Sequence, residues 1–151
     1  MSFSSKVKGE ICRHSELTKE EALAEISAIM KVSGTISFSG LGLAFRITTE
    51  NPASARHIFS LLKEHFNIHS KLMVKKSNSL KKNNIYMVLI EESMGVRDLL
   101  RDTGILTEVE GVLTLDYRID ENMVRTEELK RAYVRGAFIG GGSISNPEKT
   151  Y

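Results

Sequence analysis

Two stretches of the sequence decide the fold: TKEEALAEISAIMKVSG at residues 18–34 and TEELKRAYVRGAFIGGG at residues 126–142. Each begins with a threonine and acidic residues and ends at a glycine, which is typical of a capped helix. The two stretches align at a fixed offset of 108 residues (126 minus 18), and the match continues into the residues after each final glycine, TIS at 35–37 and SIS at 143–145. The chain therefore contains an internal repeat of a helix that leads into an extended segment.

Small residues form a stripe along both copies of the repeated helix. Ala132, Gly136 and Gly140 are four residues apart, and Ala24 and Ala28 form the equivalent stripe in the first copy. Residues at this spacing share one face of a helix, and the lack of bulky side chains lets two helix backbones approach closely. Each interior glycine costs about 1 kcal/mol relative to alanine, which tight packing would offset. We predict that these five residues pack two helices together; the alternative is a last helix that frays at its glycines.

The hydrophobic periodicity of the remaining chain predicts further helices and strands. Further helices are expected at 2–15 (capped by Ser2), 52–66 (capped by Asn51) and 93–103. Strands are expected at 35–39, 43–49, 68–77 and 85–91, with a hairpin turn at 40–42, a polar loop at 77–84 and an extended connector at 112–119. Ile36 and Phe38 are predicted on the core side of the first strand. This order favours an α+β fold with an antiparallel sheet.

The composition limits the protein class. The 151 residues are 41% hydrophobic and 26% charged, which suits one globular domain with a sizeable core, and no apolar run reaches the ~20 residues of a membrane span. The net charge of +2 (21 minus 19) does not by itself indicate a nucleic-acid binder. The single cysteine, Cys12, excludes an internal disulfide and a cysteine-rich zinc site. We expect a cytoplasmic protein.

Few residues suggest chemistry. We expect the histidines at 14, 57, 65 and 69 to lie at the surface and Cys12 to be a small buried residue. The glycines at 140–142 follow a helix instead of preceding one, so they do not form a phosphate loop. No metal ligand set and no cofactor are predicted.

A small-residue helix that ends in glycine, leads into a hairpin and occurs twice resembles the LAGLIDADG fold. KRAYVRGAFIGGGSISNPEKTY at 130–151 and MSFSSKVKGEI at 1–11 are similar to the WhiA family of sporulation and cell-division regulators. The resemblance implies a LAGLIDADG homing-endonuclease-like domain, an antiparallel sheet saddle backed by helices, followed in the family by a helix-turn-helix domain. It implies a DNA-binding transcription regulator of Gram-positive bacteria that is associated with the nucleoid.

The repeat also suggests a domain organisation. We expect residues 1–104 to form the first repeat with its N-terminal helix, and residues 105–151 to form a connector and the second motif helix. On this view the second repeat is incomplete and the family's helix-turn-helix is absent. The first motif helix then needs a partner, which is either the chain's own last helix or that of a second molecule in a homodimer.

The resemblance places the motif carboxylates of the endonucleases just before each final glycine, where they hold a divalent metal. Those positions are Ser33 and Gly141 here. Neither residue supplies the hard oxygen ligand that metal-assisted cleavage requires. We therefore predict a domain without catalytic activity, with a metal-dependent homing endonuclease as the alternative.

In this fold the sheet lies over double-stranded DNA. The side chains opposite the core set are predicted to face the groove: Thr35, Ser37, Ala44, Arg46, Thr48, His69, Lys71, Met73 and Lys75. Lys76, Lys81 and Lys82 would extend the basic patch into the neighbouring loop. Such contacts go mostly to phosphates. The alternatives are a solvated lysine face and a module that contacts other transcription or cell-division proteins, with DNA binding left to the helix-turn-helix.

Overall fold

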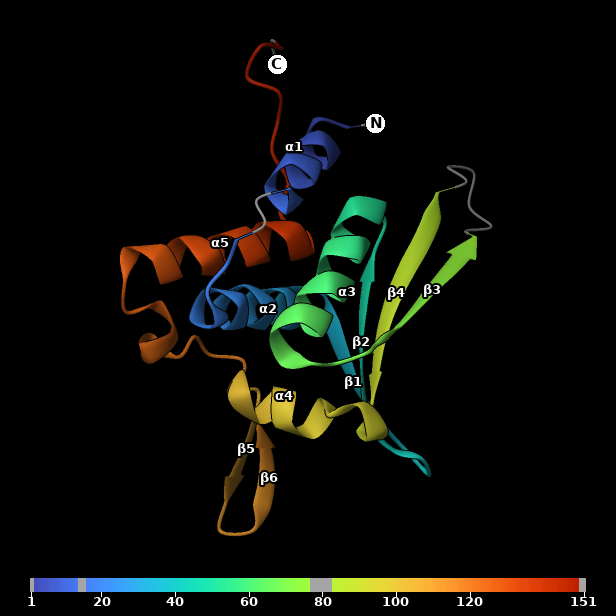
Figure 1. The fold of residues 1–151 in the computed structure, drawn as a ribbon, viewed down its shortest axis with the longest axis vertical. Coiled ribbons are helices and arrows are strands. Elements are labelled where there is room, and N and C mark those ends of the chain that lie inside the picture. The colour runs from blue at the N-terminus through green and yellow to red at the C-terminus, as the bar shows by residue number, and fades with distance from the viewer. Residues whose placement is uncertain (1, 14–15, 77–82, 150–151) are drawn as a thin grey trace.

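The computed structural model describes residues 2–13, 16–76 and 83–149 (Figure 1). Within these ranges it is an α+β structure with a four-stranded antiparallel sheet, a separate two-stranded hairpin and five α-helices. The helices are α1 (Phe3–Cys12), α2 (Lys19–Ser33), α3 (Pro52–Phe66), α4 (Val96–Asp102) and α5 (Glu127–Gly141), with short 3-10 turns η1 (Glu92–Met94) and η2 (Glu121–Val124). The strands are β1 (Gly34–Ser39), β2 (Gly42–Thr49), β3 (Lys71–Lys76), β4 (Asn84–Glu91), β5 (Leu106–Val109) and β6 (Val112–Leu115).

The two repeated helices begin in the same way. The Thr18 hydroxyl accepts a hydrogen bond from the Glu21 amide at 3.1 Å, and the Glu21 carboxylate accepts one from the Thr18 amide at 3.3 Å. The Thr126 hydroxyl accepts from the Leu129 amide at 3.2 Å. Each helix ends directly before a glycine, and the backbone of this glycine, Gly34 or Gly142, is extended. The sequence repeat is thus a structural repeat with the same 108-residue offset (127 minus 19).

The four-stranded sheet has the order β1-β2-β4-β3. One of its faces supplies the core, because alternate residues of β2 and β4 are fully buried, namely Phe45, Ile47, Val88 and Ile90. They pack in one cluster with apolar residues of α2 and α3, such as Ile29 and Leu62. Figure 1 shows α2 and α3 on the same side of the sheet. We call the opposite face of the four strands the open face.

Three sequence predictions need correction near the sheet. Phe38 does not join the core but is 66% exposed, because the β1–β2 hairpin projects beyond the helices (Figure 1). Strand β3 starts at Lys71 and not at Ile68, since the left-handed Asn67 ends α3 and the pairing of β3 with β4 begins only at Lys71. The helix expected at 93–103 is divided into η1 and α4 by Gly95, which has a φ of +96°.

The segment after α4 is a hairpin and not the extended connector that we predicted from residue 112. Strands β5 and β6 pair antiparallel from Leu106↔Leu115 to Val109↔Val112. The two residues between them, Glu110 and Gly111, both have positive φ values of 52° and 78°, as a tight two-residue hairpin turn requires. The hairpin projects away from the rest of the molecule in Figure 1.

Candidate nucleic-acid interface

The motif helices α2 and α5 lie against each other at backbone distance. A Cβ atom added to Gly136 would lie 2.1 Å from the backbone oxygen of Glu25 and 3.0 Å from the Cβ of Ala28. A Cβ atom on Gly140 would lie 3.2 Å from the Cβ of Val32. Ala24 and Ala132 are fully buried in the same interface. Helix α5 does not fray but continues through both interior glycines, so the stripe of small residues holds the two motif helices together.

A buried ionic cluster joins three helices next to this interface. Glu25 of α2 is only 2% exposed, and its carboxylate contacts the His57 Nε2 of α3 and the Arg135 Nε of α5, the latter at 3.4 Å. The expectation of a surface histidine is wrong for His57, whose side chain is 11% exposed. The partners lie 32 and 110 residues away from Glu25. The sequence signal that was available is the single acid in the middle of an otherwise apolar or small-residue helix.

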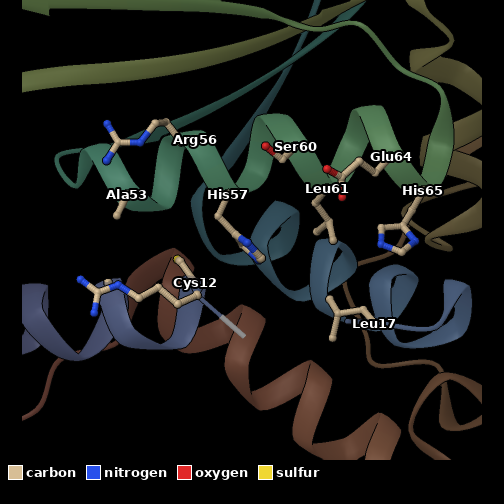
Figure 2. A pocket seen from close by; sticks show the side chains of 11 residues that line it. Cys12, Leu17, Ala53, Arg56, His57, Ser60, Leu61, Glu64 and His65 are labelled. Carbon is tan, nitrogen blue, oxygen red and sulfur yellow. The ribbon is translucent and has the colours of Figure 1, made fainter. Parts of the chain in front are cut away.

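A crevice of about 420 Å³ lies between α1 and α3 and reaches this cluster (Figure 2). Its lining includes Cys12 of α1 together with His57 and Leu61 of α3. Cys12 is half-buried, and burial raises the pKa of its thiol from 9.0 to about 11. The thiol is therefore protonated at neutral pH, which suits a packing role better than a nucleophilic one.

The open face of the sheet collects most of the side chains that were predicted to face DNA. Its longest row crosses all four strands, with Thr35 beside Arg46, Arg46 beside Leu89 and Leu89 beside Lys71. The next row contains Thr48, Met87 and Met73. Directly opposed residues of neighbouring strands point to the same face. Ser37 and Ala44 extend this face toward the β1–β2 turn, and Lys75 lies beside Ile85 at the other end.

Three cations lie on the open face. Arg46, Lys71 and Lys75 are exposed. The Lys71 Nζ lies 3.0 Å from the Glu91 carboxylate, and both side chains are open to solvent. Among the described residues, no ion pair is found for Arg46 or Lys75. Because an exposed pair contributes at most about 1 kcal/mol, Lys71 can exchange Glu91 for a phosphate at little cost.

Some of the predicted basic residues do not join this face. His69 is exposed, but it lies before the first residue of β3. The strand pairing therefore does not assign its side chain to either face of the sheet. Lys76 is not in the loop but is the last residue of β3, and its alternation with Lys75 directs it to the opposite face. Lys81 and Lys82 lie outside the described residues.

Strand β4 supplies residues of the open face that sequence reasoning missed. Ile85, Met87 and Leu89 alternate with Tyr86, Val88 and Ile90, so both faces of the strand are largely apolar. When both faces of a strand are apolar, polar and apolar residues do not alternate along it, so the sequence does not show which face is the outer one. The antiparallel partners Lys71, Met73 and Lys75 of β3 could have identified that side once the pairing was known.

The two motif positions next to the final glycines carry no acid. The Ser33 hydroxyl donates to the Ile29 carbonyl oxygen at 3.0 Å, and Gly141 is the last residue of α5. Across residues 2–13, 16–76 and 83–149, no group of three His, Cys, Asp or Glu side chains is placed to hold a metal ion. In the same ranges, no helix has the length and hydropathy to cross a membrane.

Solved structures with the same fold support the LAGLIDADG-like architecture. The crystal structure of the N-terminal LAGLIDADG domain of DUF199/WhiA superposes with a TM-score of 0.65 at 20% identity over 99% of this chain and 63% of that one. Full-length DUF199/WhiA from Thermatoga maritima superposes with a TM-score of 0.60 at 18% identity, over 97% of this chain and 42% of that one. The predicted fold class is therefore confirmed.

Sequence comparison identifies the family. The chain is 78% identical to a probable cell division protein WhiA of Clostridium beijerinckii and 71% identical to one of Clostridium perfringens, in each case over 100% of this chain and 48% of the relative. The chain thus spans about half the length of the curated relatives it matches. The WhiA N-terminal LAGLIDADG-like domain family matches residues 19–106, more than half of the chain, and the WhiA LAGLIDADG-like domain family matches residues 130–151. The chain therefore belongs to the WhiA family.

Proposed function

We propose that this chain is the N-terminal part of a DNA-binding transcription regulator of sporulation and cell division, and that its sheet contacts double-stranded DNA. The row of Thr35, Arg46, Leu89 and Lys71 across the open face carries the proposal. Neighbouring strands are ~4.8 Å apart, so Arg46 and Lys71 are separated by two such spacings, or about 10 Å. The major groove of B-DNA is about 12 Å wide, which allows these two long side chains to reach the phosphates on its two sides.

The contacts of this face are mainly electrostatic. Arg46, Lys71 and Lys75 would neutralise phosphates, which fixes the position of the domain and makes its affinity depend on salt. Three phosphate contacts correspond to a loss of affinity of about fortyfold between 50 and 200 mM salt. A nucleoid-associated location in the cytoplasm follows from this role.

The proposal includes the absence of DNA cleavage. The hydroxyl of Ser33 is bonded within its own helix and Gly141 has no side chain, whereas metal-assisted cleavage needs carboxylates at the scissile phosphates. Incubation with supercoiled plasmid in Mg²⁺ and in Mn²⁺ tests this point. Intact plasmid in both is the expected result, and nicked or linear plasmid would establish the endonuclease alternative.

A titration of fluorescent duplex DNA against the chain at two salt concentrations tests the binding proposal. We expect binding at low salt, with the double variant Lys71→Glu/Lys75→Glu weakened and its salt slope reduced by about 2. The matched control is Lys63→Glu/Lys130→Glu, which makes the same charge change at exposed lysines on α3 and α5. No binding at low salt, or equal losses in both double variants, would contradict the proposal.

The β5–β6 hairpin favours a second function, contact with other proteins. Val109 and Val112 are 61% and 63% exposed on one side of the hairpin, and Leu113 and Leu115 are 44% and 41% exposed on the other. A lone two-stranded hairpin is marginally stable, and grouped apolar side chains at a surface mark interaction sites. Sedimentation at high concentration tests self-association through it. The chain should dimerise, and Val112→Thr/Leu113→Thr should abolish the dimer; a monomeric native chain would exclude this partner.

A further inference from the structure

An apolar band crosses the middle of the open face, between its hydroxyl-bearing side and its lysine edge. Leu89 and Met87 of β4 lie next to each other on this face, and Met73 of β3 is directly opposite Met87. Met73 is 41% exposed and the other two are half-buried. Thr35 and Thr48 lie on the β1–β2 side of the band, while Lys71 and Lys75 lie on β3.

The position of this band relative to the cations defines what it can contact. Leu89 is in register with Arg46 on one side and Lys71 on the other, so an apolar side chain lies between two cations, and Thr35 follows Arg46 at the β1 end of the row. A duplex that places its phosphates at Arg46 and Lys71 therefore presents the floor of its major groove to Leu89 and Met87. The two cations on either side of Leu89 are complementary to phosphates, which favours DNA over an uncharged protein surface as the partner.

The floor of the major groove exposes one kind of apolar group, the 5-methyl of thymine; its other groups are hydrogen-bond donors and acceptors. Apolar side chains gain nothing from the donors and acceptors and leave them unpaired. We propose that Met73, Met87 and Leu89 recognise thymine methyl groups, so that the domain prefers A·T-rich duplexes. This inference rests on the proposed DNA contact and adds the base chemistry that the same face selects.

Replacement of thymine by deoxyuridine tests the inference, because it removes the methyl group and keeps every Watson–Crick and groove hydrogen-bonding group. Two duplexes of the same A·T-rich sequence, one with dT and one with dU, are titrated against the chain at low salt. Each methyl contact that is lost should weaken binding about fourfold. A G·C duplex should gain affinity when its cytosines carry 5-methyl groups.

Variants identify the residues responsible. Met73→Gln and Met73→Gln/Met87→Gln keep side-chain length but remove the apolar surface, and they should bind dT and dU duplexes nearly equally. Met73 is exposed, so the single variant is expected to fold as the native chain does. Val134→Gln changes an apolar side chain of α5 that is 66% exposed and lies outside the sheet, so it should keep the preference for dT.

The outcomes separate the inference from the proposed function. Equal affinity of the native chain for dT and dU duplexes would overturn methyl recognition while leaving DNA binding in place. If Met73→Gln/Met87→Gln keeps the full preference for dT, methyl recognition by these residues is likewise overturned and DNA binding stays in place. No binding to either duplex at low salt would overturn the DNA proposal itself and leave the apolar band as a protein-contact surface.

Discussion

The α2–α5 interface is formed by small side chains, whereas the open face of the sheet presents long ones. In the first, Gly136 removes a side chain so that the backbone of α5 can reach Glu25 and Ala28. In the second, Arg46, Lys71 and Met73 extend from the sheet into solvent. Changes in the helix pair should therefore act on stability, and changes on the open face should act on binding and leave the fold intact.

The largest expected effect comes from the buried cluster beside the helix pair. Glu25→Ala removes the buried carboxylate that contacts His57 and leaves Arg135 with the more distant Glu21 carboxylate at 3.9 Å. It should lower the free energy of unfolding by about 3–5 kcal/mol, as measured by urea denaturation. The matched control is Glu20→Ala in the same helix. Glu20 forms an exposed pair with Arg125 at 2.6 Å, so its loss should cost at most about 1 kcal/mol. Similar losses in both variants would contradict the role of Glu25.

Gly136→Ala tests the close approach of the two motif helices directly. The added methyl group meets a backbone oxygen that cannot rotate away, so a net loss of about 2 kcal/mol is expected even though alanine favours helices. Gly9→Ala in α1 is the control, because a Cβ atom there has no neighbour within 4 Å. It should stabilise the chain by about 0.5–1 kcal/mol. A neutral or stabilising Gly136→Ala would show that α2 and α5 are farther apart than described.

The protected thiol of Cys12 provides a test within the helix layer. Its pKa of about 11 is 2 above the reference of 9.0, so at pH 8 the thiolate fraction should be about a hundred times smaller than in the unfolded chain. Alkylation by iodoacetamide should accelerate accordingly in urea. Since the pKa is raised in the folded state, the contribution of this thiol to stability should be constant below pH 9 and fall as the pH rises toward 11. Equal alkylation rates in the folded and unfolded chains would contradict this burial.

The smallest effect is expected at the acid of the open face. Glu91→Gln frees Lys71 from its pair and removes a negative charge from the binding surface. Affinity for duplex DNA should therefore rise about twofold to fivefold at low salt, and the free energy of unfolding should fall by at most about 1 kcal/mol. Glu128→Gln, at an exposed position of α5, makes the same charge change elsewhere. An increase of the same size in that control would indicate a general charge effect and not a local contact.

Local chemistry explains why much of the fold could be predicted. Interactions within a few residues could be predicted from the sequence. They are the capping box at Thr18 and Glu21, the asparagine cap before Pro52 and the glycine that ends each motif helix. The β5–β6 hairpin was missed although Glu110-Gly111 is a turn signal, because its strands are short and most of their apolar residues are exposed. Periodicity detects a strand only when one of its faces is buried.

The candidate site was less predictable because its geometry depends on pairing. Arg46, Lys71 and Lys75 could be assigned to one face from strand alternation alone, whereas Lys76 was grouped with the loop although the predicted strand at 68–77 included it, and its alternation with Lys75 places it on the opposite face. The apolar band needed the register between β3 and β4, which no local pattern specifies. The cluster of Glu25, His57 and Arg135 depends on the packing of three helices, so the sequence singles out Glu25 but not its two partners.

The methionine methyl groups give the most direct test of the claim that DNA binds the open face. The chain has six methionines, of which Met73 and Met87 lie on the open face and Met30 and Met123 are buried among the helices. With methyl-labelled methionine, addition of duplex DNA should shift the NMR signals of Met73 and Met87 and leave those of Met30 and Met123 in place. Unchanged Met73 and Met87 signals at saturating DNA would contradict the account.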